Sequence, residues 1–255
     1  MTILGVHDSG ETSQSRFAIH LNSHHFALGM EGSGGAPACG RGRQTLHCAP
    51  ATMNLDTFTG GIFDTNCFFL RDHGILIDAP QDAAAWLATR GYAVKTLLLT
   101  HVHIDHVWDA ARIQREHGCR VGYHADGEPM VTVPDFFRQF GFGWDIEPIT
   151  PGFHIAESPA LAVEGVTFQV LHVPGHCPGS LCFLEKDARV LFGGDVLFAG
   201  GVGRTDLPGG DTDLLFTGIR EKVFPLGDDI TVLPGHGPAT KIGIERRTNP
   251  YVGEV

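Results

Sequence analysis

The segment that decides the fold of this chain is Thr96–His106, with the sequence TLLLTHVHIDH. Its first five residues form a mostly apolar run that is typical of a buried strand. Because side chains alternate in direction along an extended backbone, His101 and His103 can face one cation together. A helical pattern follows, so the chain must turn here, and the turn redirects Asp105 and His106 toward a second point nearby. These four side chains indicate a site for two metal ions rather than one.

Length, charge and cysteine usage restrict the class of protein. The chain has 255 residues with 42% hydrophobic residues and many Gly and Pro, which favours a globular α/β protein with many loops. A formal net charge of −11 argues against nucleic acid and anionic membrane as partners, because both attract basic surfaces. No apolar run is long enough to span a bilayer, and no secretory signal is visible. The six cysteines form no CxxC pair, which is typical of a reducing, cytoplasmic environment.

Residues 1–53 differ from the rest of the chain. The stretch Gly29–Pro50 is rich in Gly, Ala, Arg and Cys and shows no sustained period of 2 or 3.6 residues. We expect residues 1–53 to be a peripheral or poorly ordered N-terminal extension, with Met53 as an alternative start. A β-structured extension built around residues 16–28 is the other interpretation. The main domain then comprises residues 54–255.

From residue 54 onward, predicted strands and helices alternate, which is typical of a layered α/β fold. The pattern predicts helices over 81–90, 107–117 and 211–223. It predicts strands over 65–70, 74–77, 96–100, 120–123, 153–155, 161–163, 166–173, 180–185, 189–192 and 230–233. The segment 126–150 is irregular, and we expect its aromatic rings to fill the core beneath a long loop, a pocket wall being the alternative. These rings are Phe136, Phe137, Phe140, Phe142 and Trp144.

Three later segments also carry ligand-type side chains at the ends of predicted strands. They are residues 173–180 (VPGHCPGS), 191–195 (LFGGD) and 232–238 (VLPGHGP). Each has glycine beside the ligand, which permits the tight backbone and close approach that a ligand loop requires. Cys177 follows His176 directly; we expect a small packed side chain there, a redox-sensitive thiol being the alternative.

Together the four segments supply five histidines and two aspartates. Imidazole and carboxylate without thiolate suit zinc, iron or manganese. Seven ligands serve two ions if one carboxylate is shared, and Asp195 is the natural bridge because a carboxylate has two oxygens. We assign one ion to His101, His103 and His176, and the other to Asp105, His106 and His236. A water or hydroxide between the ions, with its pKa lowered toward neutrality, would complete both sites.

The motifs THVHIDH, PGHCPGS, GGD and PGHGP resemble the successive ligand motifs of the metallo-β-lactamase superfamily. The resemblance covers about residues 54–255. It implies an α/β fold, the αββα sandwich in which two mixed β-sheets are flanked by helices, with two divalent ions at one edge, zinc being the first choice. The loop 200–211 (GGVGRTDLPGGD) resembles that of glyoxalase II-like hydrolases and persulfide dioxygenases, and the C-terminal tail resembles short, single-domain glyoxalase II-like proteins of bacteria.

This resemblance implies a hydrolase that cleaves a small-molecule acyl thioester, such as a hydroxyacyl-glutathione, by a metal-bridging hydroxide. We expect Asp105 to orient the hydroxide as well as to bind metal. Asp78 is a candidate hydrogen-bond partner of a ligand histidine, with the N-cap of the next helix as its alternative role. Arg204 is the candidate for binding a substrate carboxylate. Arg246 and Arg247 are further candidates, with solvated surface charge as the alternative.

Other activities in the superfamily remain open. Full-length glyoxalase II carries a helical C-terminal domain that holds glutathione, whereas only 19 residues follow His236 here. The first alternative is a mononuclear iron persulfide dioxygenase. The resemblance to that group implies one iron held by His101, His176 and Asp195. A β-lactamase is a weaker alternative. A nuclease is disfavoured by the acidic charge of the chain. The non-enzymatic alternative is a protein that binds metal without catalysing a reaction.

Overall fold

The computed structural model describes residues 53–133, 138, 141, 143, 146–150 and 152–254. Nearly all of the N-terminal extension predicted over 1–53 lies outside the described residues. So do the five aromatic residues whose rings we expected in the core or a pocket wall, namely Phe136, Phe137, Phe140, Phe142 and Trp144.

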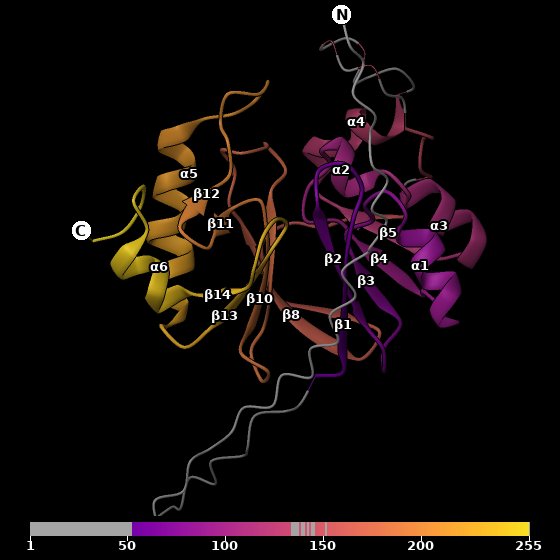
Figure 1. Cartoon of the computed structure of the whole chain (residues 1–255), viewed down its shortest axis with the longest axis horizontal. Helices are drawn as coiled ribbons and strands as arrows, with labels where there is room; N and C mark the ends of the chain where they lie inside the picture. Colours follow the sequence, from indigo (N-terminus) through magenta and orange to yellow (C-terminus); the bar gives the residue numbers. More distant parts are fainter. Residues whose placement is uncertain are drawn as a thin grey trace, which may run out of the picture.

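Within the described residues, two six-stranded mixed sheets stack face to face, with helices on both outer sides (Figure 1). The first sheet has the order β1-β2-β3-β4-β5-β6. Its strands are β1 (Leu55–Gly60), β2 (Thr65–Leu70), β3 (Ile75–Ile77), β4 (Thr96–Leu98), β5 (Arg120–Tyr123) and β6 (Phe153–His154). The pairs from β1 to β3 are antiparallel, and those from β3 to β6 are parallel.

The second sheet has the order β14-β13-β10-β9-β8-β7. Its strands are β7 (Ser158–Val163), β8 (Val166–His172), β9 (Leu181–Glu185), β10 (Val190–Gly194), β13 (Thr231–Pro234) and β14 (Thr240–Lys241). Only β10 and β13 pair in parallel among these. A small two-stranded sheet joins β11 (Leu197–Phe198) to β12 (Gly201–Val202). Because parallel neighbours end at the same edge of a sheet, the loops after β10 and β13 emerge side by side.

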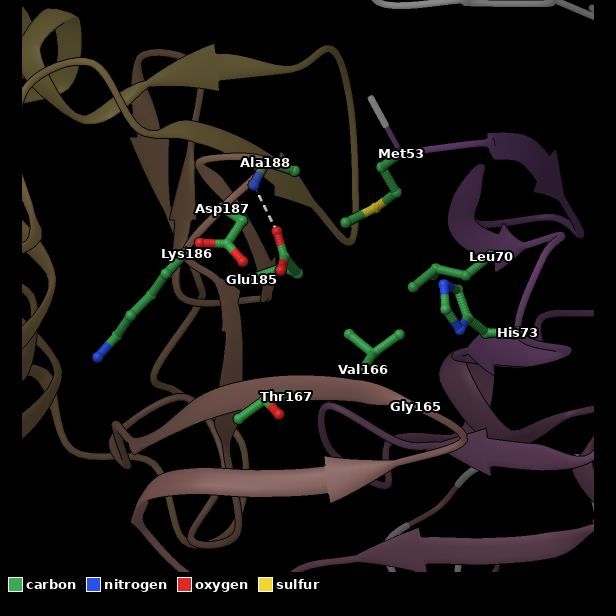
Figure 2. Close-up of a pocket in the computed structure, with 10 residues that line it drawn as sticks. All are labelled: Met53, Leu70, His73, Gly165, Val166, Thr167, Glu185, Lys186, Asp187 and Ala188. Atoms are coloured by element: carbon green, nitrogen blue, oxygen red, sulfur yellow. Dashed lines mark hydrogen bonds between the residues drawn. The ribbon is translucent and has the colours of Figure 1, made fainter. Parts of the chain in front are cut away.

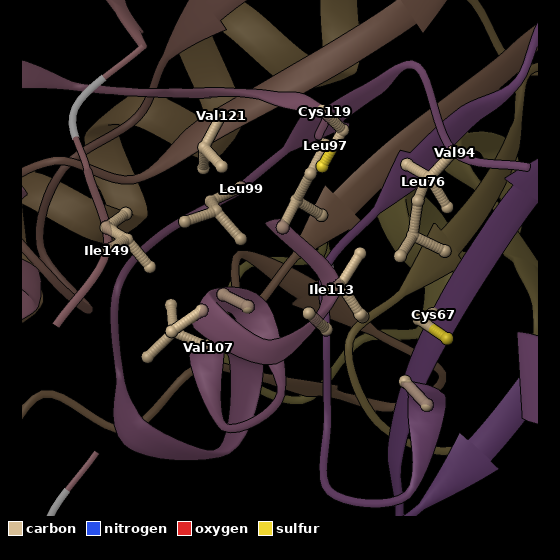
Figure 3. Packing of buried hydrophobic residues seen from close by; sticks show 14 of the residues in the cluster. Cys67, Leu76, Val94, Leu97, Leu99, Val107, Ile113, Cys119, Val121 and Ile149 are labelled. Carbon is tan, nitrogen blue, oxygen red and sulfur yellow. The ribbon is translucent and has the colours of Figure 1, made fainter. Parts of the chain in front are cut away.

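Buried apolar side chains form three clusters in the described part of the chain, one for each contact between layers. The first lies between the first sheet and helices α1 (Ala83–Arg90) and α3 (Ala110–His117) (Figure 3). The second fills the space between the two sheets and contains Phe68, Phe168 and Phe192. The third lies between the second sheet and the helices that follow it, which are α5 (Thr212–Gly218), a π-helical turn (Ile219–Val223) and α6 (Ile242–Thr248). This is the predicted αββα order of layers.

Several boundaries differ from the sequence-based expectation. The helix predicted over 107–117 is two helices, α2 (Ile104–Val107) and α3, so Asp105 and His106 lie on a helical turn rather than in a loop. The predicted N-cap of α5 is confirmed, since Asp211 accepts a hydrogen bond from the Leu214 amide at 2.9 Å. The sequence pattern did not predict β1 or α6. No helix among the described residues combines the length and the apolar character required to cross a bilayer.

Candidate metal centre

All seven predicted ligands follow strands that end at one edge of the sandwich. The end of β4 leads to His101 and His103, and the short helix α2 then carries Asp105 and His106. The loop between β8 and β9 provides His176, Asp195 directly follows β10, and His236 comes two residues after β13. The structure brings these seven side chains together.

Three of the ligands, His101, His103 and His176, form what we call the histidine set. The His176 Nε2 atom lies 2.8 Å from His103 Nδ1 and 3.2 Å from His101 Nε2. His101 and His176 are buried, and His103 is half-buried. Three imidazole nitrogens therefore converge on one small volume, as binding of one cation requires.

The other set, which we call the mixed set, consists of Asp105, His106 and His236. The Asp105 Oδ2 atom lies 3.1 Å from His236 Nε2 and 3.4 Å from His106 Nε2. Asp195 lies between the two sets: its Oδ1 is 3.3 Å from His106 Nε2, and its Oδ2 is 3.3 Å from His236 Nε2 and 3.6 Å from His176 Nε2. Asp195 therefore contacts rings of both sets.

Hydrogen bonds from outside the centre fix three of the rings through Nδ1. The acceptors are Asp78 Oδ2 for His106 (2.9 Å), the Arg204 carbonyl for His176 (2.7 Å) and the Phe63 carbonyl for His236 (3.0 Å). An Nδ1–H that donates to such an acceptor turns Nε2 inward, and Nε2 offers the lone pair that a metal requires once it carries no proton.

Asp78 is buried, and both oxygens of its carboxylate accept hydrogen bonds. It follows β3 with φ of 61°, and besides His106 it accepts hydrogen bonds from the Thr100 amide and hydroxyl, both at 2.8 Å. The residue before α1 is Asp82, so the alternative role of Asp78 as an N-cap is wrong. Asp78 instead connects the ends of β3 and β4 to one ring of the mixed set.

Two polar residues at the start of β2, Thr65 and Asn66, hold the mixed set and were missed from the sequence. The Thr65 hydroxyl donates to Asp105 Oδ2 at 2.8 Å. Asn66 donates through Nδ2 to the carbonyls of Pro234 and Gly237, at 3.0 and 2.9 Å, and so fixes the loop of His236. The available signal was two polar residues opening a strand that is buried throughout.

Glycine next to the ligands allows close packing, as expected. A Cβ atom on Gly235 would lie 2.2 Å from Asp195 Oδ1 and 2.6 Å from His106 Cε1. Any other residue at position 235 would therefore displace both ligands.

Opposite electrostatics distinguish the two sets. In the histidine set, burial and neighbouring histidines lower the pKa of His101 well below its ordinary value, and burial with His176 lowers that of His103 to about 3. In the mixed set, burial alone would lower the pKa of His106, but Asp105, Asp195 and Asp78 raise it well above the ordinary value. The pKa of His236 rises to about 10, because the hydrogen bonds that its ring donates to the carboxylates of Asp105 and Asp195 outweigh burial.

The residues present fit two divalent cations. Among the described residues, His106 Nε2 and Asp195 Oδ1 are buried side-chain atoms without a hydrogen-bond partner, and both point into the centre. A buried polar atom left without a partner costs about 1–3 kcal/mol. Metal coordination would satisfy both atoms, and their chemistry, imidazole and carboxylate without thiolate, suits zinc, iron and manganese.

The predicted arginines lie in different surroundings. The Arg204 guanidinium is exposed and pairs with Asp206 through two contacts of 2.7 Å, while its carbonyl holds His176. Arg246 and Arg247 both pair with Asp228.

Cys177 is fully buried, and burial raises the pKa of its thiol.

A cavity of about 390 Å³ opens elsewhere, at the opposite ends of the strands (Figure 2). Its walls include Leu70 at the end of β2, Val166 at the start of β8 and Glu185 at the end of β9. The ligand loops leave from the other edge, so this cavity is separate from the metal centre.

Comparison with known proteins agrees with this geometry. The model of the metallo-β-lactamase superfamily matches residues 60–236. The chain belongs to this superfamily. It is 37% identical over 210 residues to hydroxyacylglutathione hydrolase GloC of Haemophilus influenzae, and the match covers 78% of this chain and 98% of that protein.

Two crystal structures are similar over most of the chain. BLEG-1 B3 metallo-β-lactamase has a TM-score of 0.72 and 32% identity, covering 78% of this chain and 99% of that one. TTHA1623 in a di-iron-bound form has a TM-score of 0.68 and 35% identity, covering 76% and 98%. With the gathered histidines and aspartates, these matches identify the chain as a metallo-hydrolase of the superfamily.

Proposed function

We propose that this metallo-hydrolase cleaves the thioester bond of a small acyl thiol such as a hydroxyacyl-glutathione. The observation that carries the proposal is the pair of ligand sets sharing Asp195, in a chain 37% identical to a hydroxyacylglutathione hydrolase. A centre for two ions suits hydrolysis at neutral pH. When bound, two divalent ions supply a water of lowered pKa and a Lewis acid for the carbonyl oxygen. We propose zinc for both positions, with iron as the alternative favoured by the di-iron relative.

The chain's own residues would hold and orient the reacting groups. The histidine set and the mixed set would each hold one cation, and Asp195, which contacts rings of both sets, would be shared between them. Asp105 is held by the Thr65 hydroxyl at 2.8 Å, so its carboxylate has a fixed direction beside His236. We propose that Asp105 accepts a hydrogen bond from the attacking water and directs its lone pair toward the carbonyl carbon.

The surroundings of the mixed set suit a small acyl group. Ile62 and Phe63, on the turn between β1 and β2, are exposed large apolar side chains, and the Phe63 carbonyl holds His236. The Phe198 ring lies 6.1 Å from the His236 ring. We propose that these apolar groups contact the acyl part. Arg204 would bind a carboxylate of the thiol carrier, which would have to replace Asp206 as its partner.

The second candidate is hydrolysis of a β-lactam, favoured by the 32% identity to BLEG-1 B3 metallo-β-lactamase over 99% of that chain. Both reactions need a water activated beside a carbonyl, so the metal centre suits either. Persulfide dioxygenation by one iron on His101, His176 and Asp195 stays a prediction of the sequence resemblance. It leaves Asp105, His106 and His236 without a metal-binding role, although they gather into a complete ligand set.

Parallel assays separate these activities. Purified protein is analysed for bound metal and then assayed on lactoyl-glutathione, a β-lactam and glutathione persulfide, with oxygen consumption followed for the last. Two ions per chain and a kcat/KM for the thioester at least about 100-fold above that for the β-lactam would support the proposal. The reverse preference would establish the β-lactamase, and one iron with oxygen consumption would establish the dioxygenase.

A further inference from the structure

The hairpin formed by β11 and β12 links the two halves of the metal centre along the chain. Asp195, which contacts rings of both sets, lies two residues before the hairpin. Arg204, whose carbonyl accepts a hydrogen bond from His176 Nδ1 at 2.7 Å, lies two residues after it. The Phe198 ring on β11 is 6.1 Å from the His236 ring. The position of the hairpin therefore affects both sets.

The hairpin needs support from outside itself. Its strands have two residues each and form a two-stranded sheet of their own. A two-stranded hairpin is only marginally stable by itself in water. Gly203, directly after the hairpin, packs closely on the centre, since a Cβ atom there would lie 3.0 Å from His176 Cβ. A shift of the hairpin would therefore be transmitted to the His176 ring.

Two polar side chains at the C-terminal end of the chain provide this support. Glu245 lies on α6 and Asn249 directly follows it, and Figure 1 shows α6 on the same outer side of the second sheet as the hairpin. Glu245 Oε2 accepts a hydrogen bond from the Gly200 amide at 2.9 Å. Asn249 Nδ2 donates to the Gly201 carbonyl at 3.0 Å and to Glu245 Oε2 at 2.9 Å. The pair therefore holds two consecutive backbone groups of the hairpin.

Both side chains are buried, Glu245 at 2% and Asn249 at 0% exposure. Burying a carboxylate or an amide is costly unless its polar atoms are hydrogen-bonded. Here the other oxygens are also satisfied: Glu245 Oε1 accepts from the Thr240 hydroxyl, and Asn249 Oδ1 accepts from the Tyr251 amide at 3.0 Å. Apolar residues would pack the helix on the sheet without this cost, so the polar pair indicates that the hairpin has to be fixed.

From these contacts we propose that Glu245 and Asn249 are positioning residues of the metal centre, which act by fixing the β11–β12 hairpin. The Arg204 carbonyl then stays within hydrogen-bond distance of His176, and the Phe198 ring stays beside the mixed set. The inference rests on the proposed thioester hydrolysis only for its kinetic readout, because the other two measurements need no substrate.

Substitutions of Glu245 separate the reach of the side chain from its charge. Glu245→Gln keeps the length: its carboxamide oxygen can accept from the Gly200 amide, and its NH2 group can donate to the Thr240 hydroxyl. Glu245→Asp keeps the charge, but its shorter side chain no longer reaches Gly200. Asn249→Ser shortens the other side chain of the pair. Ile242→Val, at a fully buried residue of the same helix, is the control for lost stability alone.

Hydrogen exchange of the metal-free proteins, followed by mass spectrometry, measures how firmly the hairpin is held. We expect the amides of residues 197–203 to exchange at least about tenfold faster in Glu245→Asp and Asn249→Ser than in wild type. Exchange in Glu245→Gln and Ile242→Val should stay within about threefold of wild type. Unchanged exchange in both shortened variants would overturn the inference, as would equal acceleration in Glu245→Gln or Ile242→Val.

Zinc binding and kinetics report the effect on the centre. Because His176 loses its fixed partner, the zinc affinity of the histidine set should fall about tenfold in Glu245→Asp. At saturating zinc, displacement of Phe198 should raise KM for lactoyl-glutathione roughly fivefold, with kcat within about twofold of wild type. Wild-type zinc affinity and KM in both shortened variants would overturn the inference and leave the pair a purely structural role. A wild-type protein that binds zinc but cleaves no thioester would refute the proposed function alone, since exchange and zinc affinity would still test the positioning.

Discussion

The two halves of the metal centre differ in how they are charged before metal binds. The histidine set is neutral near pH 7, because burial lowers the pKa of all three of its imidazoles. In the mixed set, carboxylates raise the pKa of His106 and His236 above neutrality, so protons occupy it. The same residue type therefore serves as a free lone pair in one half and as a cation in the other.

This difference teaches what each half contributes. In the histidine set, nitrogens that lie 2.8 and 3.2 Å apart have few carboxylates to balance a cation, and Asp195 is 3.6 Å from His176. The mixed set has Asp105 and Asp195 in direct contact with its rings, and Asp78 behind His106. We infer that the imidazoles of the histidine set are already unprotonated when their ion binds, whereas those of the mixed set must release protons to bind theirs. The following changes test this contrast.

Asp195→Asn should have the largest effect, because Asp195 contacts both sets. Asparagine keeps the volume but removes the charge that bridges the two ions. We expect both metal sites to weaken and kcat/KM for the thioester to fall by roughly 10³-fold or more. Elemental analysis and steady-state kinetics measure the two effects. Activity within tenfold of wild type would show that the sets do not act as one centre.

His236→Ala should remove the ion from the mixed set alone. His236 contacts Asp105 and Asp195 but none of the three histidines in the other set. We expect one metal ion per chain to be lost and hydrolysis to be largely abolished. His154→Ala, at an exposed histidine paired with Glu128, is the control and should retain both ions. A fully active His236→Ala protein would refute the assignment of two ions.

Metal binding should depend on pH in one half of the centre only. Protons on His106 and His236 compete with metal, so the affinity of the mixed set should fall as the pH falls. The loss should approach about two log units per pH unit while both protons are displaced. The histidine set, whose pKa values lie below neutrality, should bind without this dependence near pH 7. Calorimetry in buffers of different ionisation enthalpy measures how many protons are released when each ion binds. Equal proton release for both ions would contradict the difference in protonation between the histidine set and the mixed set.

Asp78→Asn should weaken the mixed set more than the histidine set. Asp78 accepts the Nδ1–H of His106 from behind, whereas the Arg204 carbonyl holds His176 in the other set. Replacing a residue that supports a metal ligand typically costs 10–100-fold in metal affinity. We expect a loss in this range for the ion of the mixed set. The loss for the other ion should be smaller, because Asp78 reaches the histidine set only through the Thr100 hydroxyl, which lies 3.2 Å from His101 Nδ1. Asp213→Asn, an exposed carboxylate on α5, is the matched control. A loss shared equally by both ions would contradict the separation of the two sets.

Arg204→Ala should give the smallest effect. The backbone carbonyl that holds His176 is retained in the variant, so the histidine set should stay intact. An exposed charge contact contributes about 1 kcal/mol, so KM should rise about fivefold while kcat stays the same. A fall in kcat would assign Arg204 a role in the chemistry rather than in substrate binding.

The alternation of strands and helices predicted a layered α/β fold, and the resemblance of the ligand motifs to the superfamily supplied the αββα order of layers. The ligands could be predicted because apolar strands end at the ligand motifs. Asp78 was a candidate because it lies at the end of a neighbouring predicted strand. The structure shows that these strands, β3 and β4, pair in parallel, so their ends meet at one edge. The strand β1 was missed because it is largely half-buried and not strongly apolar. The helix α6 was missed because it has only seven residues, and packing of Ile242 on the third core stabilises it more than its sequence pattern does.

Other features depend on contacts between distant parts of the chain. Thr65 and Asn66 reach the mixed set only because β2 lies beside the loop of His236. The pKa contrast between the sets depends on which carboxylate faces which ring, and spacing along the chain does not determine this. His124 and His172 stack on each other from opposite sheets, so no local motif marks this contact.

The most direct test of the central claim is a crystal structure of the metal-loaded protein with anomalous scattering recorded at the absorption edge of its metal. We predict two peaks in the metal centre, one within bonding distance of His101, His103 and His176, the other within bonding distance of Asp105, His106 and His236. Asp195 should contribute one oxygen to each. A single peak on His101, His176 and Asp195, with the mixed set unbound, would contradict the account.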